Sequence, residues 1–556
     1  MISFDGYVSG FRRRVAEHPH RVAVRFCPAG STADEEALSY AELDRAARSV
    51  AQWLRARTAP GQRALLSFHP GTGFIRAFLG CLYAGVIPVP VPAQGGHSRQ
   101  ESRAHGIEAD SGAGLTLDDA LLEEAAAADL LGWTPPAVVP RMPAFLQYTS
   151  GSTSDPKGVI VSHAALVHNI GLMGRSHGWQ AGQTWCSWLP AYHDMGLIAM
   201  MLTPLYLGGT AVLMPPTDFL KRPLSWLRLI DRTGAAISCA PNFAYELCAR
   251  QATDEQIAEL DLSRWTHACN GAEPVDAATL ERFAERFAPA GFRPEALLPG
   301  YGLAESTLFV TGTRMETPPV VTAVDAAALA AGRIERAGPG ESGQPLVSSG
   351  IVRELEVRIV DPETTRVLPD REIGEIWIRG DSLAEGYWGR PEETARTFGA
   401  TAQGHGGGFL RTGDLGALSD GELYVTGRIK EMIIVHGRNL YPHDIERELT
   451  ALEEEFGTLP SAAFAVPDGP HEEIVVVQEL RARRREGSEL SRLATGARTR
   501  LAQRLGVRVG AVQFVRVGEV RRTTSGKIQR TLMRELYLKG ALAQAGSPRP
   551  GKADAQ

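Results

Sequence analysis

Apolar residues in the first 310 positions alternate between short β-branched runs and longer amphipathic windows. Ser39-Tyr40-Ala41-Glu42 has the spacing of a capping box, which predicts a helix running to about Arg57. Similar alternation predicts strands near residues 64–68, 185–188, 211–214, 235–239, 266–269 and 296–298. Alternating strands and helices favour largely parallel sheets with helices on both faces. Ligands of such sheets bind at the carboxyl ends of the strands.

The pattern changes twice further along the chain. Residues from about 310 to 425 are β-rich, and a mixed unit of strands and helices follows Gly427. We therefore predict an α/β protein whose large N-terminal region, residues 1–429, has mostly parallel sheets sandwiched by helices plus a β subdomain at about 310–425. A small, mobile α+β C-terminal domain should occupy residues 430–540. Residues 541–556, rich in Ala, Gly, Pro and Ser, predict a disordered tail.

One window, residues 195–216, carries no charge. Pro204 and the pair Gly208-Gly209 divide it into a short helix, a turn and a strand, so it predicts buried core and no membrane span. The N-terminal residues lack the apolar segment of a signal peptide. The six cysteines have no CxxC pair, which is typical of reduced thiols. These observations predict a cytoplasmic protein.

Charge is unevenly distributed. The net charge is −6, yet residues 481–539 hold 16 Lys/Arg against 4 Asp/Glu, which leaves +12 there and −18 elsewhere. A basic end on an acidic body favours an acidic partner or ligand, although a solvated surface of arginines explains the same composition. We expect no nucleic-acid partner. The 14 histidines form no cluster with metal-ligand spacing.

The stretch at residues 148–158, Tyr-Thr-Ser-Gly-Ser-Thr-Ser-Asp-Pro-Lys-Gly, lies between an apolar strand and a capped helix start at Ser162. Its hydroxyls and backbone N–H groups can surround a polyphosphate, to which Lys157 adds a positive charge. The alternative is a solvated polar connector. It is not a Walker A loop, because Pro156 precedes the lysine and Gly158 stands where that motif needs Ser or Thr.

Six further loops follow in a fixed order: Trp188-Leu-Pro-Ala-Tyr-His193-Asp-Met-Gly, Asn270-Gly-Ala-Glu-Pro, Tyr301-Gly-Leu-Ala-Glu-Ser, Arg411-Thr-Gly-Asp, Gly427-Arg-Ile-Lys-Glu and Thr524-Ser-Gly-Lys-Ile-Gln-Arg. With the stretch at 148–158, they resemble the acyl-adenylate-forming superfamily of acyl-CoA ligases, luciferases and peptide-synthetase adenylation domains, over residues 10–538. Within that superfamily, the residues of these motifs, together with Ala240-Pro-Asn-Phe and Gly437-Arg-Asn-Leu-Tyr-Pro, most resemble those of the fatty acyl-AMP ligases. That family activates fatty acids with ATP and transfers the acyl group to an acyl carrier protein.

The resemblance implies a role for each candidate site residue. Lys527 would be the mobile catalytic cation, His193 would lie near the reacting carboxylate, and Glu305 would bind Mg²⁺. Asp414 would accept the ribose hydroxyls, as an ionised carboxylate can. Lys430 would be the hinge between domains. The remaining ATP-binding residues would be Thr149, Ser150, Gly151, Ser152, Thr153, Lys157, Gly271, Ala272, Glu273, Tyr301, Gly302, Ala304 and Arg428, and the acyl-binding residues Asn242, Phe243 and Met200. Ala304 replaces the threonine usual in the superfamily, as is common in this subfamily.

The acyl acceptor is open, because coenzyme A and a holo acyl carrier protein present the same thiol. Residues 321–343 resemble the insertion of fatty acyl-AMP ligases, which is thought to restrain the domain movement needed for CoA thioesterification; an ordinary surface excursion is the alternative. We predict a fatty acid substrate, ATP and Mg²⁺, and a carrier protein of a polyketide or lipopeptide pathway. The alternatives are a fatty acyl-CoA ligase and a non-catalytic acyl-adenylate-binding protein.

Overall fold

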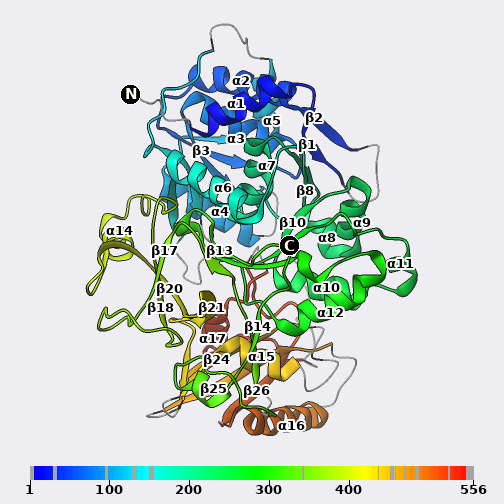
Figure 1. The fold of residues 1–556 in the computed structure, drawn as a ribbon, viewed down its shortest axis with the longest axis vertical. Helices are drawn as coiled ribbons and strands as arrows, with labels where there is room; N and C mark the ends of the chain where they lie inside the picture. The colour runs from blue at the N-terminus through cyan, green and yellow to red at the C-terminus, as the bar shows by residue number, and fades with distance from the viewer. Residues whose placement is uncertain are drawn as a thin grey trace, which may run out of the picture.

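The computed structural model describes residues 6–28, 34–93, 98–127, 133–148, 156–340, 343–435, 438–450, 456, 459–468, 471–481, 487–506, 508–523 and 526–545. It has the predicted α/β class. The blue and cyan N-terminal elements lie at one end of the long axis, and the sheet β24–β26 with helix α16 lies at the other (Figure 1).

The strands of the N-terminal region form a parallel core. Five neighbouring pairs in the order β12-β11-β10-β8-β9-β1 are parallel, and β2 adds an antiparallel edge. A second sheet, β4-β3-β5, is also parallel. The strands are β1 (Val22–Phe26), β2 (Glu36–Ser39), β3 (Arg63–Ser67), β4 (Ile87–Val91), β5 (Leu115–Leu117), β8 (Thr184–Ser187), β9 (Thr210–Leu213), β10 (Ile237–Ala240), β11 (His267–Asn270) and β12 (Leu297–Gly302).

Helices follow the strands as the alternation predicts. The Ser39–Glu42 capping box is formed and begins α2, which ends at Arg55. The longer helices of this region are α1 (Tyr7–Glu17), α2 (Tyr40–Arg55), α3 (Gly73–Ala84), α4 (Ser98–Ser111), α5 (Asp119–Ala126), α6 (His163–His177), α9 (Leu224–Thr233), α10 (Asn242–Gln251) and α12 (Ala277–Phe287). The shorter helices are α7 (Thr203–Leu207), α8 (Pro216–Lys221), α11 (Asp254–Ala258), η2 (Ala288–Ala290), η3 (Pro294–Ala296) and η4 (Ala304–Ser306).

The uncharged window at 195–216 is buried core. It contains the π-helix η1 (Met195–Leu202), followed directly by α7 and β9, and every residue of η1 is buried. Pro204 does not break the helical path, since it is the second residue of α7, directly where the π-helix η1 gives way to an α-helix. Within the described ranges, none of the helices combines the length and the apolar character that a membrane span requires.

The β-rich middle of the chain extends the main sheet. Strand β13 pairs antiparallel with β12, and the order continues through β16, β21, β20, β18 and β17. These elements are β13 (Phe309–Gly312), β16 (Ile351–Val352), β17 (Glu356–Val360), β18 (Gly374–Arg379), α14 (Pro391–Phe398), β19 (Ala400–Ala402), β20 (Gly406–Ser419) and β21 (Glu422–Arg428). The segment predicted as an insertion contributes β14 (Val321–Val324) and α13 (Ala326–Ala330), and β14 pairs with β15 (Gln344–Val347).

The C-terminal elements have sheets and apolar clusters of their own. They are β22 (Ile433–Val435), β23 (Arg438–Leu440), α15 (Pro442–Thr450), β24 (Ser461–Asp468), β25 (His471–Glu479), α16 (Gly487–Leu505), β26 (Val509–Val515) and α17 (Arg530–Leu538). The tail that was predicted to be disordered from residue 541 is ordered over its first residues, 541–545. Leu542 and Ala545 are buried, and the Ala545 N–H donates to the Phe514 carbonyl, because these apolar side chains complete the cover of β26. Residues 546–556 lie outside the described part.

Candidate active site

Two strands, β6 (Pro143–Tyr148) and β7 (Gly158–Ser162), enclose the predicted phosphate loop. They pair antiparallel, and Tyr148 lies directly opposite Gly158. The sequence pattern missed β7, but the capped helix start predicted at Ser162 is confirmed, because α6 begins at His163 and the Ser162 hydroxyl accepts the Ala165 N–H. Thr149, Ser150, Gly151, Ser152 and Thr153 lie outside the described residues, so their predicted role stays a prediction.

Lys157, at the end of this loop, is half-buried beside the segment that enters α14. Its ammonium group forms an ion pair with Glu393 and lies 5.4 Å from the centre of the Tyr387 ring. The Tyr387 hydroxyl donates to Glu305 at 2.9 Å. The loop lysine and the predicted metal carboxylate therefore share one aromatic neighbour.

Glu305 lies in the single 3₁₀ turn η4, directly after β12, together with the buried Ala304. Burial raises the pKa of the Glu305 carboxyl, while the Tyr387 hydroxyl opposes that rise. The next residue but one, Thr307, has φ 64°, an uncommon conformation for a threonine. Backbone strain of this kind often occurs at functional sites.

The carboxylate of Asp414, on β20, is almost completely buried and has a partner on each oxygen. One oxygen lies 2.9 Å from Arg428 Nε, and the other accepts the Tyr301 hydroxyl at 2.8 Å. Asp414 raises the pKa of Arg428, which keeps the guanidinium charged. Burial and Asp414 together raise the pKa of Tyr301, so the phenol stays protonated as a donor. Three of the predicted nucleotide residues therefore form one polar group.

Near this polar group, small residues allow neighbouring backbone segments to pack closely together. A Cβ on Gly302 would lie 1.8 Å from the Leu308 carbonyl oxygen, and one on Gly271 would lie 3.0 Å from the Gly300 carbonyl. Ala272 adopts φ 68°. The chain packs against itself at these positions, so glycine is needed at 302 for the fold as well as for the predicted approach of adenine.

The predicted acyl-side residues lie at the start of α10 and in the core. The backbone N–H of Phe243 donates to Glu273 at 2.6 Å, and the ring of Phe243 packs edge-on against Trp188. Burial raises the pKa of the Glu273 carboxyl. Met200 is fully buried in η1. Glu273, predicted to contact ATP, thus also holds the first turn of the helix that bears Asn242 and Phe243.

Lys527 reaches this N-terminal site from the C-terminal unit. The preceding Gly526 has φ 89°, and a Cβ there would lie 2.8 Å from the Phe243 ring. Lys527 interacts electrostatically with Asp194, Asp414 and Glu273. Burial and the neighbouring Arg428 lower the pKa of Lys527, while the carboxylates favour its charged form.

His193 lies in the loop that precedes η1. Its Nδ1 is 2.8 Å from Asp194 Oδ1, and the Met195 N–H donates to Asp194 at 2.7 Å. Burial favours the neutral form of Asp194, but His193 and Lys527 outweigh it and lower the pKa of Asp194. Sequence reasoning missed Asp194, although it stands inside the quoted motif. It also missed Tyr387 and Glu393, which lie in a segment that carried no predicted chemistry.

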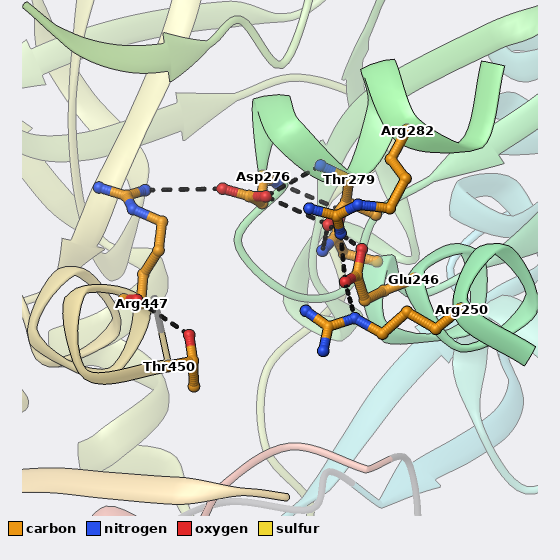
Figure 2. Close-up of polar contacts among 8 residues, drawn as sticks. Glu246, Arg250, Asp276, Thr279, Arg282, Arg447 and Thr450 are labelled. Atoms are coloured by element: carbon orange, nitrogen blue, oxygen red, sulfur yellow. Dashed lines mark hydrogen bonds and ion pairs between the residues drawn. The ribbon is translucent and has the colours of Figure 1, made fainter. Parts of the chain in front are cut away.

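The two parts of the chain also contact each other beside this site. Arg447 of α15 lies 3.9 Å from Asp276, whose other oxygen accepts the Thr279 N–H at the start of α12 (Figure 2). The backbone N–H of Asp276 donates to Asn242 Oδ1 at 3.2 Å. On the same face, Glu246 binds Thr279, Arg250 and Arg282 (Figure 2). A polar chain therefore connects the predicted acyl-side helix to α15. Lys430, the predicted hinge, is exposed just after β21.

A large α/β region whose polar loops meet a lysine from a small C-terminal unit defines the class of adenylate-forming ligases. The model of the family described as AMP-binding enzyme matches residues 11–388. The chain belongs to the AMP-binding enzyme family, whose members use ATP, and it is an adenylate-forming ligase.

Relatives and solved structures agree with this assignment. The chain is 41% identical to the medium-chain-fatty-acid–[acyl-carrier-protein] ligase JamA of Moorena producens, over 80% of each chain. It is 40% identical to a 4-hydroxyphenylalkanoate adenylyltransferase of Mycobacterium marinum, over 86% of this chain and 82% of that protein. It resembles the fatty acyl-adenylate ligase from Legionella pneumophila in complex with acyl adenylate and pyrophosphate, with a TM-score of 0.75, 36% identity and coverage of 98% and 99%. The predicted resemblance to fatty acyl-AMP ligases is confirmed.

Proposed function

We propose that this protein activates a fatty acid as acyl-AMP with release of pyrophosphate, and then transfers the acyl group to the phosphopantetheine thiol of an acyl carrier protein. The names of the relatives support fatty-acid activation, and JamA is named as a ligase to an acyl carrier protein, whereas fadD21 of Mycobacterium bovis is named as a putative fatty-acid–CoA ligase. Another relative is named as a 4-hydroxyphenylalkanoate adenylyltransferase, so the choice among hydrophobic carboxylic acids as the substrate stays open.

The position of Lys527 is the observation that carries the adenylation step. Attack of a carboxylate oxygen on the α-phosphate forms one P–O bond and breaks the bond to pyrophosphate. Two anions must approach each other, so a cation that neutralises both has a large effect on the barrier. Lys527 is close enough to the nucleotide carboxylate Asp414 and to Glu273 beside α10 to interact electrostatically with both, and the preceding Gly526 lies against Phe243, so a cation is available where the two anions would meet.

The other residues supply binding and orientation. Asp414 would accept ribose hydroxyls, with Tyr301 and Arg428 holding its carboxylate in place. Lys157 would exchange Glu393 for the departing phosphates. His193, held by Asp194, would lie beside the reacting carboxylate.

Glu305 suits a magnesium ion that is shared with phosphate oxygens. It is a half-buried carboxylate that accepts a hydrogen bond from Tyr387, and Mg²⁺ is commonly bound by one or two carboxylates plus substrate phosphates. The ion would neutralise phosphate charge when bound. Burial raises the pKa of Glu305, and a cation would favour its ionised form.

The insertion supports the choice of a carrier protein. Its apolar residues Val324, Leu329 and Ile334 pack in one cluster with Tyr441, and Ile429 and Met432, on either side of Lys430, pack against the same cluster. A shared apolar core across the hinge would resist rotation of the C-terminal unit, because rotation would expose it to water. The basic residues at 481–539 would attract an acidic carrier protein.

Fatty-acid-dependent exchange of labelled pyrophosphate into ATP tests the adenylation step. We expect exchange with at least one chain length among short, medium and long fatty acids, and with Mg²⁺ present. Absence of exchange with all of them, and with 4-hydroxyphenylalkanoates, would favour a non-catalytic acyl-adenylate-binding protein.

Weakening the insertion core should increase acyl-CoA formation. Leu329→Ser and Ile334→Ser remove buried apolar contacts near the hinge, and we expect the ratio of acyl-CoA to acyl-carrier product to rise at unchanged pyrophosphate exchange. The matched control is Val321→Ser, which changes an exposed residue of the same insertion. Deletion of residues 321–343 should give the same shift. Efficient acyl-CoA formation by the unaltered protein would instead indicate a fatty acyl-CoA ligase.

A further inference from the structure

A polar bridge connects the two ends of the predicted phosphate loop and uses residues that have no assigned role. On one side, the Tyr148 hydroxyl donates to Asp110 Oδ2 at 2.7 Å. On the other side, Arg390 donates to the Pro156 carbonyl at 3.2 Å. Asp110 and Arg390 join the two halves through a hydrogen bond of 2.9 Å. The bridge therefore runs from the residue before the loop to the residue just before Lys157.

Each member of the bridge is held by a different element. Asp110 lies in the last turn of α4, Tyr148 ends β6, and Arg390 stands just before α14. Tyr148 is buried, and a Cβ at Gly158 would lie 2.8 Å from its ring, so only glycine opposite leaves room for the tyrosine. The segment that carries Arg390 also pairs with β7, since the Trp388 N–H donates to the Gly158 carbonyl at 2.7 Å.

The bridge contains an ion pair, and this ion pair can fix the position of the backbone beside Lys157. Asp110 and Arg390 are both partly buried, with side-chain exposures of 19% and 30%, so their interaction is less screened than a surface pair. Asp110 holds the guanidinium on the Pro156 carbonyl, and the next residue is Lys157. A fixed Pro156 carbonyl limits the positions that the Lys157 ammonium can reach. Small displacements of a positioned charge reduce catalysis strongly.

We propose that Asp110 and Arg390 are positioning residues for the triphosphate of ATP, acting through the two ends of the loop and through Lys157. This inference rests on the proposed function of the loop as a phosphate site. On this proposal, the Asp110–Arg390 pair, which lies outside the seven sequence motifs, influences the affinity for ATP and the rate of pyrophosphate release. It does not influence the choice of fatty acid.

The test compares Asp110→Asn, Arg390→Ala and the double variant with the unaltered protein, both in binding of a fluorescent ATP analogue and in pyrophosphate release. Each single variant should weaken nucleotide binding and raise the KM for ATP about tenfold, as expected when a charge-assisted hydrogen bond is lost. The KM for the fatty acid should stay unchanged. The double variant should be no worse than the worse single variant, because both disrupt one bridge. Arg390→Lys should recover part of the loss.

Arg396→Ala is the matched control, because Arg396 is exposed on α14, the helix that begins directly after Arg390. Additive effects in the double variant, an equal rise in the KM for both substrates, or losses that only parallel a lower melting temperature would overturn the proposal. Nucleotide binding is measured without any acid. A protein that binds the ATP analogue with the predicted dependence on Asp110 and Arg390, yet releases no pyrophosphate, would contradict the proposed function and leave the bridge standing.

Discussion

Lys527→Ala should lower the rate of fatty-acid-dependent pyrophosphate exchange by about 10²–10³-fold, the usual loss when a charge that stabilises a transition state is removed. Lys527 interacts electrostatically with Asp194, Asp414 and Glu273, and burial lowers its pKa. Alanine leaves the approaching carboxylate and the α-phosphate without this cation. The melting temperature should change little, because the substitution removes a charge whose own burial is costly.

The control for this substitution is Lys539→Ala, which removes an exposed lysine at the end of α17. A second arm uses pH. Since the pKa of Lys527 is lowered, its charged form is lost at a lower pH than that of an exposed lysine, and exchange should decline on the alkaline side. Lys527→Arg should move that decline upwards, because arginine stays charged. Full activity of the alanine variant would contradict the assigned role.

Asp414→Asn should raise the KM for ATP by about 10- to 100-fold, because hydrogen bonds to a charged acceptor contribute about 1.5–3 kcal/mol. The amide keeps the shape of the side chain but has only one acceptor oxygen, and its NH₂ group cannot accept from a ribose hydroxyl. It also leaves Arg428 with a neutral partner. The KM for the fatty acid should remain unchanged in steady-state assays.

Deoxy nucleotides sharpen this experiment. If Asp414 accepts both ribose hydroxyls, the unaltered protein should discriminate against 2′-deoxy-ATP and 3′-deoxy-ATP, and Asp414→Asn should discriminate less. Asp420→Asn is the control, since Asp420 lies in the exposed turn between β20 and β21. Equal discrimination by the variant and the unaltered protein would place the ribose elsewhere.

Local patterns predicted most of the secondary structure. The capping box at Ser39 and Glu42 formed as expected, and the uncharged window at 195–216 became buried core. Strand β7 was missed because Gly158–Ser162 is short and lies next to a polar loop, so its partner in β6 determines its conformation. The start of the tail was also missed, because the burial of Leu542 depends on β26 and its neighbours.

The candidate site was predictable where its residues belong to ordered motifs. His193, Glu305, Asp414, Arg428 and Lys527 were predicted in this way; their roles stay predictions, and the structure brings Asp414, Arg428 and Lys527 into one electrostatic group. Their partners were not predictable. Tyr387 contacts Glu305 across 82 positions, and Glu393 contacts Lys157 across 236. No spacing rule links positions so far apart.

The sequence alone determined which chemical groups this protein has, their order along the chain and the alternation that makes an α/β sheet, because these depend on local periodicity and on residue type. Only the tertiary structure decided which of those groups meet. The approach of Lys527 to the N-terminal site, the bridge from Asp110 to Arg390 and the apolar cluster across Lys430 each require contacts between distant segments. Such contacts form when the chain buries its apolar surface, and the local sequence pattern does not predict which distant segments will meet.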